Sequence, residues 1–264
     1  MAKHMKKLKL RVIVLAIVLF FSYLTSSLAV GLPLQINHGL ALLTVSLLNA
    51  AVVSNFVASA KWSGIRLILA LFAIYYCITT FLTQIETIVF LEYFADIIPA
   101  TYIPKLFIQG IIVALIFSIS AVLIHGKLKN NQADFSVENK TLVGMSFVSM
   151  LYVILYFSFG MFVFMPLAGN SFYEYYGNLQ LPMWIIPLQI FRGFIWAGLA
   201  LIVVKAVDSK HELTTALLFS VLMASLLLMP NEFMPDRIRF AHFVEIATSN
   251  FILGWVAVRI LKYF

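Results

Sequence analysis

The sequence has very little charge for its length. Only 11% of its 264 residues are Asp, Glu, Lys or Arg, whereas 62% are hydrophobic and the mean hydropathy is +1.00. A soluble domain carries about 25% charged residues, so a water-soluble globule is excluded. The chain is therefore expected to be a polytopic integral membrane protein whose main partner is the lipid bilayer.

Cysteine and the common cofactor motifs are also scarce. The single cysteine, Cys77, lies in an apolar run and is expected to be a packing residue. A glycine-rich phosphate loop and a His-Glu-x2-His helix are both absent from the sequence. Their absence argues against an ATP-driven machine and against a zinc protease. We predict no metal and no cofactor.

Long apolar runs are what the sequence has in abundance. Eight of them are long enough to cross a hydrocarbon core of about 30 Å. Their apolarity is continuous and does not alternate as in barrel strands, so it predicts helices. We predict an all-α fold, a polytopic transmembrane helical bundle that forms a single integral membrane domain over residues 1–264. The predicted helices cover residues 12–34, 39–60, 65–90, 102–124, 142–165, 183–204, 213–229 and 238–261.

The first apolar run has an alternative interpretation as a secretory signal. It follows a basic stretch at residues 1–11, and Ser27, Leu28 and Ala29 resemble a cleavage site of small residues. The run continues beyond that site and has the length of a membrane span, about 20 residues. A retained first helix is the favoured interpretation.

Positive charge is distributed unevenly among the connections between the runs. If the N-terminus is cytoplasmic, 14 of the 18 Lys and Arg residues fall on the inner side, and the exceptions are Lys105, Arg192, Arg237 and Arg239. This asymmetry predicts that both termini and the polar linker at residues 126–140 are cytoplasmic, in a protein of the cell membrane. The net charge of +7 therefore reflects topology, and no nucleic-acid partner is expected.

The linker divides the chain into four predicted helices plus four. A parallel internal repeat is one interpretation of this division. Both halves carry acids near the outer end of their third helix, but no further register of identity relates them.

Ionisable groups within apolar runs mark candidate functional sites, because charge is costly in hydrocarbon. Counted from the helix ends, Glu86, Arg192 and Glu245 lie at depths of about 7, 13 and 10 Å below the outer surface. Neighbouring polar residues fall on the same helix faces at about 100° per residue. The predicted pocket residues are Glu86, Gln84, Gln189, Arg192, His242, Glu245 and Asn250. Three polar faces at one depth predict an internal pocket that opens outward.

Charge restricts the possible partners within this pocket. A buried, isolated arginine costs several kcal/mol, so Arg192 is expected to pair with Glu86 or Glu245. The other acid is then expected to lie with His242. The tyrosine-rich outer loop at residues 166–182 is either an interfacial aromatic belt or a lid over the pocket.

Three functions are compatible with such a pocket. The favoured one is transporter-like handling of a small solute, lipid or proton. An intramembrane hydrolase acting on a lipid or peptide is an alternative. However, the Glu-Glu-x3-Arg and His-x3-Asn motifs of the intramembrane glutamate proteases are absent. A non-catalytic scaffold with a structural ion pair is the third. Enzymatic activity, substrate and oligomeric state stay open at this point.

Overall fold

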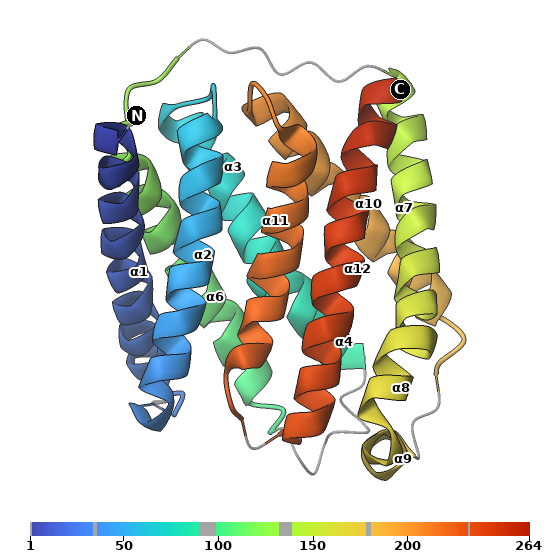
Figure 1. Cartoon of the computed structure of the whole chain (residues 1–264). Coiled ribbons are helices and arrows are strands. Elements are labelled where there is room, and N and C mark those ends of the chain that lie inside the picture. Colours follow the sequence, from blue (N-terminus) through green and yellow to red (C-terminus); the bar gives the residue numbers. More distant parts are fainter. Residues whose placement is uncertain (1, 34–35, 90–98, 132–138, 178–180, 232) are drawn as a thin grey trace. The chain divides into compact units, whose positions relative to one another are not determined.

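The computed structural model of the protein describes residues 2–33, 36–89, 99–131, 139–177, 181–231 and 233–264 (Figure 1). Within these ranges the regular secondary structure is helical, and eight helical segments are long and apolar enough to cross a membrane. The predicted all-α polytopic bundle is thus confirmed. The protein is a multi-pass integral membrane protein. The cytoplasmic orientation of its termini stays a prediction.

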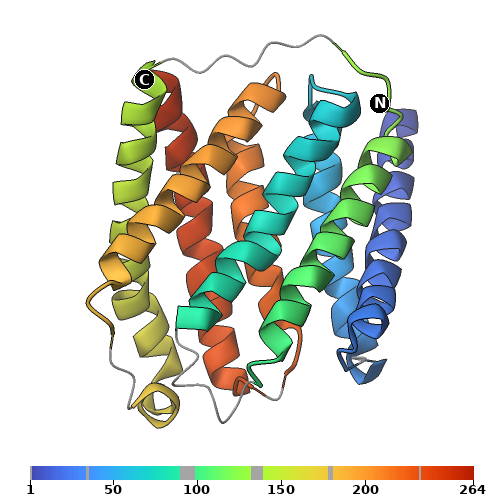
Figure 2. The ribbon, with the colours of Figure 1, turned by 180° about the vertical axis from the view of Figure 1, so that it is seen from behind.

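The chain divides into two compact units, and unit 1 comprises residues 1–133. Its helices are α1 (Ala2–Val30), α2 (Gly39–Ser59), α3 (Gly64–Tyr76), α4 (Leu82–Val89) and α6 (Tyr102–Ile124). A short 3-10 turn, η1 (Ile36–His38), precedes α2. The π-helical segment η2 (Cys77–Phe81) joins α3 to α4, so these elements form one span. Helix α1 packs against α2 and α6, and α6 packs against α3 (Figures 1 and 2).

Unit 2 comprises residues 134–264. Its helices are α7 (Asn139–Phe159), α8 (Met165–Ala168), α9 (Asn170–Tyr176), α10 (Ile185–Ala206), α11 (His211–Ala224) and α12 (Asp236–Tyr263). The π-helical η3 (Gly160–Phe164) joins α7 to α8, and the 3-10 turn η4 (Ser225–Leu228) extends α11. Helix α7 packs against α10 and α12, and α12 packs extensively against α11.

The two units have the same order of neighbouring spans. In each, the second span lies beside the first, the first beside the fourth, and the fourth beside the third. Each unit contains four of the candidate spans. A parallel internal repeat would produce such a shared order, but the two sequences share no register of identity and the repeat stays a prediction.

Several serines and threonines within the spans donate their hydroxyls to a carbonyl of their own helix. Ser22 donates to the carbonyl of Val18 at 2.7 Å, and Ser118 donates to that of Ala114 at 2.6 Å. An unsatisfied hydroxyl in hydrocarbon costs several kcal/mol, so this local bond lets an apolar run contain such residues without an interhelical partner.

Longer polar side chains in unit 1 bond between helices. The amide of Asn49 on α2 donates to the hydroxyl of Tyr75 on α3 at 3.3 Å. The Tyr75 hydroxyl also lies 3.2 Å from the hydroxyl of Tyr23 on α1. Asn49 and Tyr75 are buried, so this chain of bonds ties three helices together inside the unit.

The turn into α3 depends on Gly64, whose φ is +63°. Ser63 precedes the helix but makes no side-chain cap bond. The first backbone N–H groups are instead satisfied by asparagines that follow α6. Ser63 N–H donates to Asn131 Oδ1 at 3.1 Å, and Ile65 N–H donates to Asn130 Oδ1 at 2.9 Å. This clamp joins the α2–α3 connection to the segment after α6.

Gly64→Ala is expected to lower the melting temperature of the detergent-solubilised protein. A Cβ there would lie 2.8 Å from Asn130 Cα, a backbone atom that cannot move without breaking the clamp. Left-handed backbone alone costs a residue with a Cβ about 1–2 kcal/mol, which corresponds to about 2–8 °C in a chain of this size. A thermal-shift assay measures the change.

Two glycines serve as controls for this substitution. Gly126→Ala carries the φ strain alone, since φ is +71° and no atom lies within 4 Å of the added Cβ. Gly39→Ala also has open space and an ordinary helical backbone, so it should leave the melting temperature unchanged. A Gly64→Ala protein that melts like Gly126→Ala would show that contact with Asn130 is unimportant.

Candidate functional site

Two of the predicted site residues, His242 and Glu245, form a hydrogen bond in the first turns of α12. His242 Nδ1 lies 2.9 Å from Glu245 Oε2. The i, i+3 spacing on a helix places both side chains on one face. Glu245 is 9% exposed, and the side chain of His242 is 22% exposed. The carboxylate is therefore nearly enclosed, while the imidazole keeps partial access.

The other ring nitrogen of His242 bonds to a residue far away in the sequence. Its Nε2 lies 2.9 Å from the hydroxyl of Tyr176, the last residue of α9. Tyr176, His242 and Glu245 thus form a continuous chain of hydrogen bonds, which we name the Tyr–His–Glu relay.

The imidazole in the relay is held by an aromatic contact. The ring of Phe164 stacks on that of His242, with centroids 3.9 Å apart and an interplanar angle of 11°. Phe164 closes the π-helical segment η3. A π turn contains more residues than an α turn and so changes the direction in which the following side chains point. The stacking fixes the plane of the ring and hence the direction of both its nitrogens.

Helix α9 is fastened over the start of α12. The hydroxyl of Tyr175 donates to the carbonyl of Phe233 at 2.6 Å. Burial raises the pKa of the Tyr175 hydroxyl, which keeps it protonated as a donor. An apolar cluster lies beneath and consists of Phe164, Ala168, Ile238 and Ala241, with Phe172, Tyr175 and Tyr176 packed against it. Tyr176 is thereby positioned on His242.

Hydrogen-bond chemistry gives the relay a direction. An ionised carboxylate only accepts, so Nδ1 of His242 must donate to Glu245. In a neutral ring Nε2 is then an acceptor, and the Tyr176 hydroxyl donates to it. If the ring is charged, both nitrogens donate. The imidazole can therefore take a proton on the Tyr176 side and release another on the Glu245 side.

A second cluster lies between α10 and α7. Arg192 is 1% exposed, and its Nη1 donates to Gln189 Oε1 at 2.9 Å. The guanidinium carbon lies 5.7 Å from the ring centroid of Tyr152 and 5.9 Å from that of Tyr156, both on α7. Trp196 lies one turn beyond Arg192 and is fully buried. Two aromatic faces thus stabilise the arginine charge in a site with little water.

The structure brings the predicted residues together in two pairs, His242 with Glu245 and Gln189 with Arg192. Asn250 instead donates to Met223 Sδ at 3.3 Å and so contributes to packing of α12 on α11. Glu86 and Gln84 lie on α4 in unit 1. Within unit 2, His242 has Glu245 as its acid, and the pairing of Arg192 with Glu86 stays a prediction.

Sequence patterns missed two members of the site. Tyr176 belongs to the outer loop at residues 166–182, which is predicted to be a belt or a lid, and Phe164 lies within the predicted helix 142–165 with no signal that sets it apart. Periodicity relates residues within one helix, but it does not show which residue of a loop folds back onto a helix 66 positions later. The density of aromatic residues in α9 was the available signal.

The described part of the chain contains no group of three or more His, Cys, Asp and Glu side chains arranged to hold a metal ion. Comparison of the chain with protein-family models, with curated proteins and with solved structures gave no match.

Neutral His242 is expected to carry its proton on Nδ1. The reason is that an ionised Glu245 can only accept a hydrogen bond, while the Tyr176 hydroxyl donates one to Nε2. Nitrogen-15 NMR of protein with labelled histidine measures the tautomer directly, with His242→Asn used for assignment. Glu245→Gln should abolish the preference for Nδ1, because an amide can donate as well as accept. A neutral ring protonated on Nε2 in the native protein would contradict this direction of the relay.

Proposed function

We propose that the protein moves a small solute or lipid across the membrane in a step coupled to protons. The Tyr–His–Glu relay is the observation that carries this proposal. It joins a hydroxyl on α9, which lies outside the membrane-spanning segments, to a carboxylate within the span of α12. Ionisable chains of this kind inside a membrane are the usual equipment of proton-coupled transporters.

The proton step follows from the geometry of the relay. Glu245 lies nine residues after the start of α12 at Asp236, or about 13 Å along the helix axis. A proton that arrives from the predicted outer side is taken up by the Tyr176 oxygen, which passes its own hydroxyl proton to His242 Nε2. The ring then releases its Nδ1 proton to the Glu245 carboxylate, which becomes neutral. After the conformational change, Glu245 returns its proton to Nδ1 and Nε2 releases one through the Tyr176 hydroxyl, which restores the first tautomer of the ring.

Neutralising Glu245 changes which conformations are accessible. A charged carboxylate is costly to place against hydrocarbon, whereas a protonated one is far less so. Protonation therefore permits α12 to move against its neighbours in a way that the charged state opposes. This difference is how proton binding is coupled to a conformational change.

The cluster on α10 supplies groups that suit a polar solute. Because arginine only donates, its bond to Gln189 Oε1 turns the amide nitrogen of Gln189 away from Arg192. That nitrogen and the indole nitrogen of Trp196 are buried donors with no hydrogen-bond partner in the described ranges. A solute with acceptor oxygens would satisfy both donors. The shared helix order of the two units also fits the parallel repeats of some transporters.

A hydrolase is less well supported. A histidine that activates water needs a ring nitrogen within hydrogen-bond reach of that water. Here Nδ1 of His242 bonds to Glu245, and Nε2 bonds to Tyr176. Both nitrogens are therefore occupied within the chain.

Glu245→Gln is expected to abolish the coupled activity without unfolding the protein. Glutamine keeps the size of the side chain but cannot bind and release a proton. Untargeted profiles of metabolites and lipids would be compared between cells that lack the gene and cells that regain it. The native gene should restore the profile, and Glu245→Gln should leave it as in the deletion.

Glu174→Gln provides the matched control, because Glu174 is an exposed acid on α9, near the relay. It should restore the profile as the native gene does. A Glu245→Gln protein that also restores the profile would favour a scaffold with a structural hydrogen bond. Products of hydrolysis that accumulate only with the native gene would favour the hydrolase.

Tyr176→Phe is expected to slow uptake without changing its final level. The substitution removes the hydroxyl that feeds His242 Nε2 but leaves the His242–Glu245 bond in place. Positioned acid–base groups contribute about 10²–10⁴-fold to proton transfer, so a loss of about a hundredfold in initial rate is expected. Uptake of the solute identified by profiling would be timed in proteoliposomes. Tyr173→Phe on the same helix, at an exposed position, should keep the native rate.

A further inference from the structure

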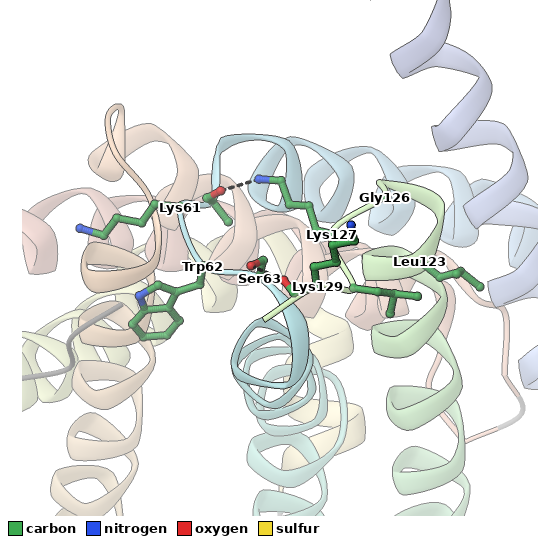
Figure 3. Close-up of a pocket in the computed structure, with 9 residues that line it drawn as sticks. Lys61, Trp62, Ser63, Leu123, Gly126, Lys127 and Lys129 are labelled. Carbon is green, nitrogen blue, oxygen red and sulfur yellow. Dashed lines mark hydrogen bonds between the residues drawn. The ribbon is translucent and has the colours of Figure 1, made fainter. Parts of the chain in front are cut away.

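Unit 1 contains a pocket that plays no part in the proposed transport step. Its volume is about 440 Å³, and it lies where the α2–α3 connection meets the segment after α6 (Figure 3). By the predicted orientation this is the cytoplasmic end of the unit. The lining includes Lys61, Trp62, Leu123, Lys127, Leu128 and Lys129.

The walls of the pocket are held together by hydrogen bonds between distant segments. Gly64 N–H donates to the carbonyl of Lys127 at 2.7 Å, and Ser63 Oγ donates to that of Lys129 at 2.7 Å. Asn131 Nδ2 donates to the carbonyl of Lys61 at 2.6 Å. The pocket is therefore a preformed part of the fold.

Three lysines line the pocket, and they differ in how they are held. Lys127 Nζ donates to the carbonyls of Ala58 and Ala60 at the end of α2, as the dashed line to Ala60 in Figure 3 marks. Its ammonium group is thus fixed in the wall. Lys61 and Lys129 are exposed and form no ion pair within the described part of the chain. Figure 3 shows the Lys61 side chain extending away from Lys127.

A further cation lies behind the pocket. The guanidinium of Arg66 lies 5.7 Å from the ring centroid of Trp62. Its Nη1 atom is buried and makes no hydrogen bond among the described residues. A buried guanidinium nitrogen without an acceptor is an unusual feature, and it adds positive potential beside the pocket.

The sequence of unit 1 supplies no carboxylate to this end. Its only acids are Glu86, Glu92 and Asp96, so residues 1–85 and 97–133 contain none. Glu86 follows Arg66 by 20 residues on the same helical span, or about 30 Å along its axis. The positive charge around the pocket is therefore compensated by none of the acids of its own unit that the structure describes.

We propose that this pocket binds the phosphate headgroup of an anionic phospholipid from the cytoplasmic leaflet. The lysines match the phosphate, because basic pockets between spans on this side of a membrane attract anionic headgroups. The exposed Leu123 and Leu128 beside the buried ring of Trp62 match the glycerol and upper acyl chains. A soluble phosphate would use the lysines but gain nothing from the leucines.

Native mass spectrometry of the full chain tests the proposal. The protein would be incubated in detergent with phosphatidylglycerol or with phosphatidylcholine at equal concentrations. Phosphatidylglycerol should bind the native protein with at least about tenfold higher affinity. The double variant Lys61→Gln, Lys129→Gln should lose about 30-fold of that affinity, since each lysine near a membrane surface contributes about fivefold.

The double variant Lys7→Gln, Lys9→Gln is the matched control. It removes the same charge from exposed positions near the N-terminus of α1, at the same end of unit 1 but outside the pocket. Its affinity for phosphatidylglycerol should stay within about twofold of the native value. An equal loss in both double variants would overturn the proposal in favour of unspecific surface charge. Melting temperatures equal to that of the native protein would establish that both variants are folded.

Competition with soluble anions distinguishes the source of the phosphate. Inorganic phosphate and glycerol 3-phosphate should displace phosphatidylglycerol only weakly, because they lack the apolar part that meets the leucines. Displacement by either at concentrations equal to that of the lipid would overturn a lipid headgroup as the occupant. Equal binding of phosphatidylglycerol and phosphatidylcholine would overturn an anionic site altogether.

Discussion

Hydrocarbon offers no hydrogen bonds to a polypeptide, so polar groups within these spans depend on partners inside the protein. In a helix the backbone N–H and C=O groups bond to one another, and a hydroxyl such as that of Ser118 donates to a carbonyl one turn earlier in its own helix. Longer polar side chains find their hydrogen-bond partner on another helix, as the amide of Asn49 does in the hydroxyl of Tyr75. The same constraint makes the exceptions informative. Gln189 and Trp196 each bury a donor that the described residues leave unmatched, on a helix that also carries a buried arginine.

The relay combines one local and two distant interactions. Helical spacing alone brings His242 to Glu245. Tyr176 reaches the ring because α9 folds back over α12, and Phe164 reaches it through the π turn of η3. The distant contacts turn an ion-pair motif into a directed path. A His–Glu pair by itself stabilises a helix, whereas the tyrosine at its open end is the group through which the proposed transport step brings protons to the carboxylate.

The two candidate sites differ in the sign of the charge they carry. In the relay a single carboxylate is nearly enclosed and bonded to an imidazole. At the basic pocket several cations lie together, and residues 1–85 and 97–133 of their unit contain no acid. The first arrangement suits a group that must change state during a cycle. The second suits a permanent attraction for an anion, as in anchoring a lipid.

The number of spans, their helical nature and the candidate residues followed from the sequence, because burial in hydrocarbon demands long apolar runs and makes polar exceptions conspicuous. The pairing of His242 with Glu245 was also within reach, since it needs only helix geometry. The tertiary structure alone decided that Tyr176 and Phe164 complete the relay, that Asn250 turns to Met223, and that the segment after α6 closes a basic pocket. Each of these depends on contacts between residues far apart in the chain, and helical periodicity carries no information about them.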